Sequence, residues 1–567
     1  TLQFNSTGSY NTGVGHRALD QVTTASHNTA VGYQALYLNT ASYNTAIGSA
    51  SLDANSTGER NTSIGYASLT ANTTGNYNTA LGMSSLESNT TGAQNTAVGY
   101  NALSQTTTAN DNTAVGYQCM NANTTGAQNT AVGKDALDAN QTAHDNTAMG
   151  VGALGVMNGG LGANCAFGNY SGDAITTGGS NNCFGYQAGT AITTGSNNCA
   201  FGTLALKSTT TADFNCAFGQ EALEANTTGT ENIAIGYNAL YTSTTNSNNT
   251  AIGTQALRLA TSNNNTCVGH NAGYNVSTGA QVTAFGKNAL YSNTTGTDVT
   301  AIGYAALFNN NASRNCAFGY YSQYGTTTGT RNISMGMYSL QSCTTGDSNV
   351  ALGDQCLHNA TTANTNTAVG RLAMYVCTTG GNNVAVGEAA GYNIDTGTGN
   401  VCLGAEAGSG QITGSGSNQL YIARDNVANS NAAVWIYGGN SGSCYQGNNS
   451  STWSTTSDRR LKKNIVDNTK GLAEINQIRV TNFEYRTREE IDLSEFPLAN
   501  DPGQVVLGEG NEGLHTGVIA QEVESVLSEC IQVSEKGAKT VNTDPIMWAL
   551  VNAVKELSAE VEQLKSQ

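Results

Sequence analysis

Residues 95–133 read NTAVGYNALSQTTTANDNTAVGYQCMNANTTGAQNTAVG, and the motif Asn-Thr-Ala-Val-Gly occurs in this stretch three times, at 95–99, 112–116 and 129–133. The motif or a close variant continues in both directions and ends each time in a glycine. There are 24 of these closing glycines, and the interval between successive ones is 17 residues or differs from 17 by one. These glycines stand at 15, 32, 48, 65, 82, 99, 116, 133, 150, 168, 185, 202, 219, 236, 253, 269, 286, 303, 319, 336, 353, 370, 387 and 404. The chain is therefore a repeat protein over most of its length.

The repeat consensus N-T-A-V-G-x-x-A-L-x-x-N-T-T-G-x-x predicts one coil of a β-solenoid. Two short apolar segments alternate with two turn clusters, and segments of four or five residues are too short for helices. Thr, Val, Ile and Phe favour strands, while Asn and Gly at the corners tolerate a positive φ. With about 4.8 Å per stacked coil, 24 coils predict a rod on the order of 115 Å long.

The alternation of side chains along a strand predicts which residues fill each coil. In Thr-Ala-Val, Thr and Val point to one face and Ala to the other. We expect the larger residues, such as Val98 and Val115, to fill the interior together with Leu103 of the second segment. The small Ala then indicates close approach by a neighbour, and because one thin coil buries little, we expect three chains to pack around a common axis.

The N-T-A-V-G repeat resembles the head repeats of trimeric autotransporter adhesins, which are β-rolls with an N-[ST]-x-A-[IV]-G signature. Similar repeats occur in phage and viral fibres. The resemblance covers 1–416 and implies a homotrimeric β-solenoid of about 24 repeats. From about Gly408 the spacing breaks down, and Ser417–Ile422 and Ala432–Tyr437 are typical of strands. Because the last coil of a solenoid needs a terminal cap, we predict a cap and linker at 417–456.

Charge density divides the chain at Ser457. Residues 1–456 carry 30 Lys, Arg, Asp and Glu, whereas the 111 residues of 457–567 carry 31. Both parts are acidic, within a net charge of −17, which argues against nucleic acid as a partner. No apolar run is long enough for a transmembrane helix, so no membrane insertion is expected. The chain begins with Thr1, which indicates a fragment or a processed product that an N-terminal attachment segment could precede.

The cysteines follow the repeat. Cys165, Cys199, Cys216 and Cys316 replace Thr three places before a closing glycine, and Cys183, Cys267 and Cys402 stand two places before one. Cysteine here acts as a small apolar strand residue, so a buried column of thiols is expected. The chain has no CxxC and no G-G-x-G-x-D pattern, and its histidines lack ligand spacing, so we predict no metal and no cofactor.

The C-terminal 111 residues contain two further motifs and a helical pattern. They are Ser457-Asp-Arg-Arg-Leu-Lys-Lys-Asn-Ile465 and, downstream, His515-Thr-Gly-Val-Ile-Ala-Gln-Glu-Val523. Apolar residues then recur at intervals of 3 and 4, which predicts a coiled coil over 546–566. These residues are Met547, Leu550, Val554, Leu557, Val561 and Leu564. Strand-like pieces between the motifs make this part a small α+β domain.

The two motifs and the terminal coiled coil resemble the C-terminal intramolecular chaperone of phage tail spikes and fibres, the endosialidase-type autoprotease. The resemblance covers 457–567 and implies that Ser457 attacks the peptide carbonyl before it, cutting Thr456–Ser457. A serine hydroxyl needs a base, and the resemblance assigns that role to Lys462, whose basic neighbours would lower its pKa. It further implies that Asp458 orients the loop and that His515 assists.

These patterns favour a structural tail fibre or tail spike of a phage, assembled as a homotrimer in the host cytoplasm and then carried on the virion outside the cell. Its partners would be other virion tail proteins and a glycan or protein receptor on the host surface. Beyond a serine peptidase acting on its own chain, no enzymatic activity is evident. The alternatives are a bacterial trimeric surface adhesin, a glycan-degrading tail spike and an ice-binding solenoid with threonine columns. The adhesin type ends in a membrane barrel, whose alternating strands 457–567 lack.

Overall fold

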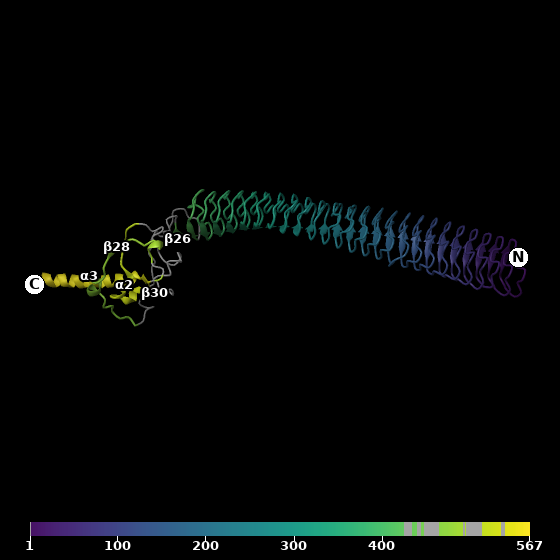
Figure 1. Ribbon diagram of the computed structural model, residues 1–567, viewed down its shortest axis with the longest axis horizontal. Coiled ribbons are helices and arrows are strands. Elements are labelled where there is room, and N and C mark those ends of the chain that lie inside the picture. The colour runs from purple at the N-terminus through teal and green to yellow at the C-terminus, as the bar shows by residue number, and fades with distance from the viewer. Residues whose placement is uncertain are drawn as a thin grey trace. The chain divides into compact units, whose positions relative to one another are not determined.

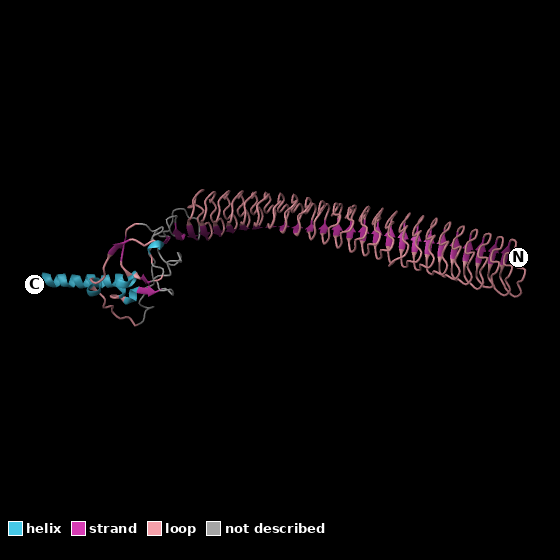
Figure 2. Ribbon diagram, in the orientation of Figure 1, coloured by secondary structure: helices cyan, strands magenta, loops and turns pink. Residues whose placement is uncertain are grey.

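A computed structural model describes residues 2–423, 434–438, 444–446, 464–491, 494, 513–533 and 539–567. The chain divides into two compact units, Thr1–Trp453 and Ser454–Gln567. The first unit is a β-solenoid in which every repeat forms one coil, so the predicted mainly-β solenoid of about 24 turns is confirmed. Figure 1 shows the coils stacked one on the next, and Figure 2 shows their strands in a continuous row.

Each of the first 24 coils contributes one short strand. The strands are β1 Thr12–Val14, β2 Thr29–Val31, β3 Thr45–Ile47, β4 Thr62–Ile64, β5 Thr79–Leu81, β6 Thr96–Val98, β7 Thr113–Val115, β8 Thr130–Val132, β9 Thr147–Met149, β10 Cys165–Phe167, β11 Asn182–Phe184, β12 Cys199–Phe201, β13 Cys216–Phe218, β14 Ile233–Ile235, β15 Thr250–Ile252, β16 Thr266–Val268, β17 Val282–Phe285, β18 Val299–Ile302, β19 Cys316–Phe318, β20 Ile333–Met335, β21 Val350–Leu352, β22 Thr367–Val369, β23 Val384–Val386 and β24 Val401–Leu403. Consecutive strands pair in parallel and in register, for example Ala114 opposite Ala131. The 17-residue period is thus the distance from one strand to its neighbour in the sheet.

The solenoid ends in a change of strand direction. Strand β25 (Leu420–Ala423) still pairs in parallel with β24, but β26 (Val434–Gly438) and β27 (Cys444–Gln446) each pair antiparallel with the strand before. These strands lie within the region expected to form the cap. Antiparallel strands interrupt the stacking of coils, because a further coil would need a parallel neighbour.

The strand side chains point in the opposite directions to those predicted from strand alternation. Ala114 and Ala131, at the centres of their strands, are fully buried, whereas the flanking Val115 and Val132 are only half-buried on the outer side. The prediction that the larger strand residues fill the interior is therefore wrong, whereas the prediction for Leu103 is confirmed, because Leu103 is fully buried. A 17-residue coil is too thin for two large side chains, so a small residue on the strand faces the leucine of the opposite wall. The close neighbour that the small Ala indicated belongs to the same coil.

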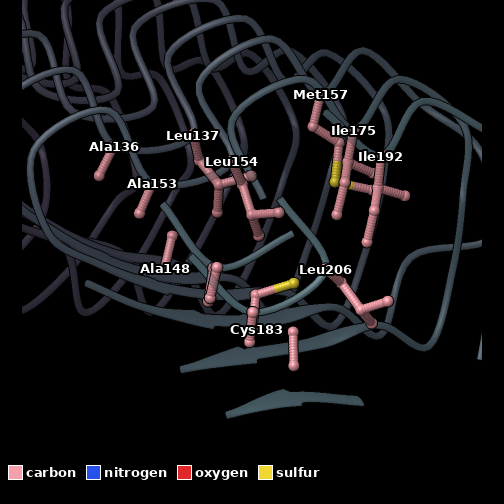
Figure 3. Close-up of a cluster of buried hydrophobic side chains, with 14 of the residues drawn as sticks. Ala136, Leu137, Ala148, Ala153, Leu154, Met157, Ile175, Cys183, Ile192 and Leu206 are labelled. Atoms are coloured by element: carbon pink, nitrogen blue, oxygen red, sulfur yellow. The ribbon is translucent and has the colours of Figure 1, made fainter. Parts of the chain in front are cut away.

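The second apolar segment of each repeat is a turn and not a strand. Ala136 and Leu137 are adjacent and both fully buried (Figure 3), which no strand could achieve because its neighbouring side chains alternate. Leu137 adopts a φ of 51° and Asp135 one of 55°, and the backbone N–H of Leu137 donates to Ala153 in the next coil. Sign changes in φ thus turn both apolar side chains inward while the peptide groups still bond to neighbouring coils.

The closing glycine and the motif asparagine have different roles. Gly133 has a φ of 141°, and a Cβ on it would lie 2.4 Å from the carbonyl oxygen of Gly150 in the next coil, so only glycine fits. Asparagines at other turn positions, such as Asn101 and Asn238, do adopt the predicted positive φ, but the motif asparagines do not. Asn129 is instead fully buried, and its Oδ1 accepts a bond from the backbone N–H of Asn146 at 3.0 Å. The asparagines therefore form an internal ladder of amides.

The cysteines divide between the two sides of the strands. Cys183, Cys267 and Cys402 take the place of the inward Ala and are buried, as expected. Cys199 and Cys216, which replace the outward Thr, are only half-buried, as are Cys165 and Cys316, so these four do not join the buried column. The cysteines from Cys119 to Cys402, and also Cys530, are all free thiols. Burial raises the pKa of Cys183 to about 12.

The second unit contains short helices and strands around one long helix. Its elements are α1 Leu472–Ile475, β28 Thr481–Phe483, the 3₁₀ turn η2 Arg488–Glu490, β29 His515–Gly517, α2 Ala520–Glu524, the 3₁₀ turn η4 Ser528–Cys530, β30 Ile531–Val533, β31 Lys539–Val541 and α3 Thr543–Lys565. Strands β28 and β29 form one antiparallel pair and β30 and β31 another. Helix α3 covers almost all of the predicted coiled-coil range 546–566, and the Asn542 side chain caps it by accepting from the Asp544 N–H.

Candidate functional site

The residues predicted to cut the chain fall largely outside the described residues. Thr456, Ser457, Asp458 and Lys462 all lie in the stretch 447–463, and the described chain resumes at Asn464. The geometry of the predicted Ser–Lys pair therefore stays a prediction. What the structure provides is the framework on the C-terminal side of that pair.

His515 lies in strand β29, directly opposite Phe483 of β28. Its half-buried ring stacks on that of Phe483 with centroids 6.1 Å apart and meets the Tyr485 ring edge-on at 5.1 Å. Two aromatic neighbours thus fix the orientation of the imidazole. A fixed imidazole can serve to position a chain segment or to transfer a proton.

Residues 517–523 of the second motif contribute to the core of the domain. Val523 is buried in a cluster with Leu527, Cys530 and Ala549, and Val518 packs against it. Glu522 receives two bonds from the Arg479 guanidinium, at 3.1 Å from Nε and 2.5 Å from Nη2. These bonds lower the pKa of the Glu522 carboxyl. The motif thus joins helix α2 to the segment before β28 and to helix α3.

Helix α3 also holds the chain that follows the first motif. The Asn552 side-chain N–H₂ donates to the backbone carbonyls of Asn468 at 2.9 Å and Lys470 at 3.0 Å. One turn further on, Glu556 Oε2 accepts the backbone N–H of Leu472 at 2.8 Å. Sequence reasoning missed these contacts, because partners 82 to 84 residues apart give no local signal.

Gly471 lies between these two contacts and is buried. A Cβ on Gly471 would lie 2.2 Å from Glu556 Oε1, well inside van der Waals contact. Its backbone N–H donates to Glu474 Oε2 at 2.8 Å, which is the main reason why the pKa of the Glu474 carboxyl is lowered. We call residues 468–472 with Asn552 and Glu556 the helix clamp.

The opposite side of α3 is apolar and exposed. Ala549 and Ala553 face the domain core and are buried, whereas the stripe predicted to form a coiled coil is 41 to 70% exposed. The stripe consists of Met547, Leu550, Val554, Leu557, Val561 and Leu564. Helix α3 thus has one side engaged within the domain and one apolar side facing solvent in the single chain.

The solenoid carries a second exposed surface, formed by the outward side chains of its strands, with one apolar column and one column that is mostly threonine. We call the two outward columns, one and three places before each closing glycine, the strand face. The column next to the glycine is Val14, Val31, Ile47, Ile64, Leu81, Val98, Val115, Val132, Met149, Phe167, Phe184, Phe201, Phe218, Ile235, Ile252, Val268, Phe285, Ile302, Phe318, Met335, Leu352, Val369, Val386 and Leu403. No residue in either column is charged, and members such as Phe218 and Met335 are more than half exposed.

Phenylalanines are concentrated in one block of the strand face, although Phe285 and Phe318 also belong to this face. Phe167, Phe184, Phe201 and Phe218 occupy four successive strands and stack with centroids 6.0, 4.3 and 5.5 Å apart. Parallel, in-register pairing places each ring over the next. The strand face is therefore not uniform along its length.

Comparison with known families assigns the C-terminal part. Residues 457–532 match the model of the Peptidase S74 family, described as the chaperone of endosialidase. The C-terminal unit carries a chaperone-of-endosialidase domain. The match begins at Ser457, the predicted nucleophile, and ends at Gln532 in β30, so helix α3 follows the matched part of this chaperone domain. No curated protein and no solved structure matches the chain.

Within 2–423 and the described parts of 434–567, no three His, Cys, Asp or Glu side chains are grouped so that they could hold a metal ion. In the same residues, no helix has both the length and the apolar character needed to cross a bilayer.

Proposed function

We propose that this chain is a subunit of a homotrimeric phage tail fibre or tail spike that attaches to a host-surface glycan or protein, and that its chaperone domain assembles the trimer and then cuts itself off. The observation that carries the proposal is the family match at 457–532, which comes after a solenoid of 24 coils in the same chain. A long, uniform solenoid suits a shaft, because each added coil lengthens it by the same step.

The proposed cut is an acyl transfer followed by hydrolysis. Lys462 takes the proton of the Ser457 hydroxyl, and Ser457 Oγ bonds to the carbonyl carbon of Thr456. The C–N bond then breaks, and its nitrogen takes a proton and becomes the new terminal amine of Ser457. Water hydrolyses the resulting ester, which leaves a carboxylate on Thr456 and restores the Ser457 hydroxyl. Asp458 orients the loop, and the aromatic neighbours of His515 hold that ring ready to assist.

Two exposed surfaces support a trimer. The apolar stripe of α3 has the spacing with which helices supercoil around each other. The strand face is charge-free along all 24 coils, and its column next to the closing glycines is apolar throughout. Soluble proteins rarely leave so long an apolar column open. Three-residue strands about 10 Å long, stacked over about 115 Å, give on the order of 1,100 Å², more than the roughly 800 Å² per partner of a standard interface. Copies with the same period fit this face coil by coil.

Threonines on the same face favour a second function, ice binding. Thr113 and Thr130, for example, are neighbours in register on successive strands, and a regular lattice of hydroxyl and methyl groups can match ordered water. A thermal-hysteresis assay distinguishes the two functions, because trimer packing would cover these threonines. Activity in the assembled protein would favour ice binding.

Replacement of Ser457 by Ala tests the proposed cleavage. The full-length chain should yield a fragment of about 47 kDa, since residues 1–456 make up 456 of 567 residues in a chain of 58.4 kDa. S457A and K462A should remain at full length on a denaturing gel, and a chain cut in S457A would contradict the assignment. The H515A variant tests the contribution of His515. We expect H515A to cut its chain more slowly than the wild type while forming the same amount of trimer.

A further inference from the structure

We propose that Asn552 and Glu556 are positioning residues for the self-cleavage, through which helix α3 holds the chain that follows the Ser457–Lys462 pair. The inference rests on the proposed cleavage and adds a means by which the reaction depends on the C-terminal helix. Neither residue belongs to the motifs that identify the domain, and both lie beyond the matched residues 457–532.

The contacts favour a purpose-built attachment. Asn552 bonds two carbonyls with one amide, and Glu556 receives a main-chain N–H on the next turn, so that α3 holds main-chain atoms on both sides of Gly471. Carboxylates bond main-chain N–H groups more strongly than neutral acceptors do. Gly471 allows this approach, because any larger residue would displace the Glu556 carboxylate.

The position of the clamp along the chain connects it to the reaction. Asn468 follows Lys462 by six residues, so a main chain fixed at 468–472 restricts where the preceding basic stretch can lie. Orientation is a large part of catalytic rate, and displacement by about 1 Å can cost a hundredfold. A held segment therefore favours the reactive geometry of the pair.

The arrangement of α3 connects the clamp to assembly. The clamp residues lie on a different side of the helix from the exposed apolar stripe. In a single chain, α3 extends from the domain with this stripe uncovered. Packing of three such helices would fix the helix that carries Asn552 and Glu556, and with it the segment 468–472. The clamp thus gives a physical route by which cleavage would await trimer formation.

The test compares cleavage rates of full-length variants within the isolated trimer fraction. E556A and N552D remove an acceptor and a donor, and each should slow the appearance of the 1–456 fragment at least tenfold. E556Q keeps an oxygen that can accept from Leu472 and should stay within threefold of the wild type. K555A, a change at an exposed neighbour on the same helix, is the matched control and should not alter the rate.

Gly471 provides a double-mutant cycle. G471A and E556A break the same contact, so G471A/E556A should be no slower than the slower single variant. Cleavage of E556A and N552D at the wild-type rate would overturn the clamp while leaving the proposed function intact. Equal slowing of E556A and E556Q would overturn the hydrogen-bond account. A wild-type chain that is never cut would overturn both the clamp and the proposed cleavage.

Discussion

Replacement of Asn129 by Ala should open the solenoid locally by a measurable amount. Asn129 Oδ1 is the acceptor for the backbone N–H of Asn146, and its Nδ2 donates to Ala143 O at 2.9 Å and Asn112 Oδ1 at 3.2 Å. A buried orphan N–H costs about 1–3 kcal/mol, and each of the two lost donor bonds about 1 kcal/mol. The sum, about 3–5 kcal/mol, corresponds to a change of about two to three and a half orders of magnitude in the local opening constant.

Hydrogen–deuterium exchange followed by mass spectrometry measures this opening, because amide exchange reports local unfolding coil by coil. Peptides that contain Asn146 should exchange at least a hundredfold faster in N129A, and faster still in N129D, whose carboxylate would face the Ala143 carbonyl. T125A changes an exposed side chain of the preceding coil and is the control. Exchange in N129A within threefold of T125A would refute the argument that the buried amides stabilise the stacking of coils.

Three further predictions follow from the inward and outward positions. A114L should destabilise the solenoid by about 1–3 kcal/mol through overpacking, while V115L on the outer side should change the melting temperature little. Burial keeps the Cys183 thiol neutral up to about pH 12 in the folded chain, whereas in the unfolded chain the same thiol ionises near pH 9. The free energy of unfolding should therefore fall as pH rises from 9 to 12, and it should fall less steeply in C183A. V115D/V132D should reduce the trimer content measured by size-exclusion chromatography with light scattering, whereas T125D should not. If V115D/V132D still forms trimers, the strand face is not the surface through which the chains pack.

The regularity of the sequence predicts the solenoid well, but not the direction of its side chains. The spacing of the glycines predicts the coils because each closing glycine must admit the carbonyl of the next coil, as Gly133 does. The direction of the strand side chains was predicted wrongly because large apolar residues usually face inward, while the burial of the leucines such as Leu103 was predicted correctly. Two signals pointed the other way. The strand centre is always small, and the adjacent pair Ala136-Leu137 cannot both be inside a strand.

In the chaperone domain, the sequence predicts local features and misses distant ones. The spacing of apolar residues in 546–566 predicts helix α3, and Asn542 supplies its N-cap. The contacts of Asn552 and Glu556 depend on how segments more than 80 residues apart pack, and a single polar residue on a helix does not reveal its partner. The catalytic assignment of Ser457 and Lys462 rests on the motif and on the start of the family match.

The parallel pairing of β1 to β24 also has a mechanical consequence. Hydrogen bonds between coils run along the axis of the solenoid, as do the bonds between successive asparagines. A pull along that axis loads the interfaces between coils in series, so the weakest interface sets the force at which the rod separates, however many coils it has. A sideways load is instead shared by many coils. Length in this solenoid therefore adds reach without adding tensile strength, and resistance to pulling must come from contacts that run beside the coils.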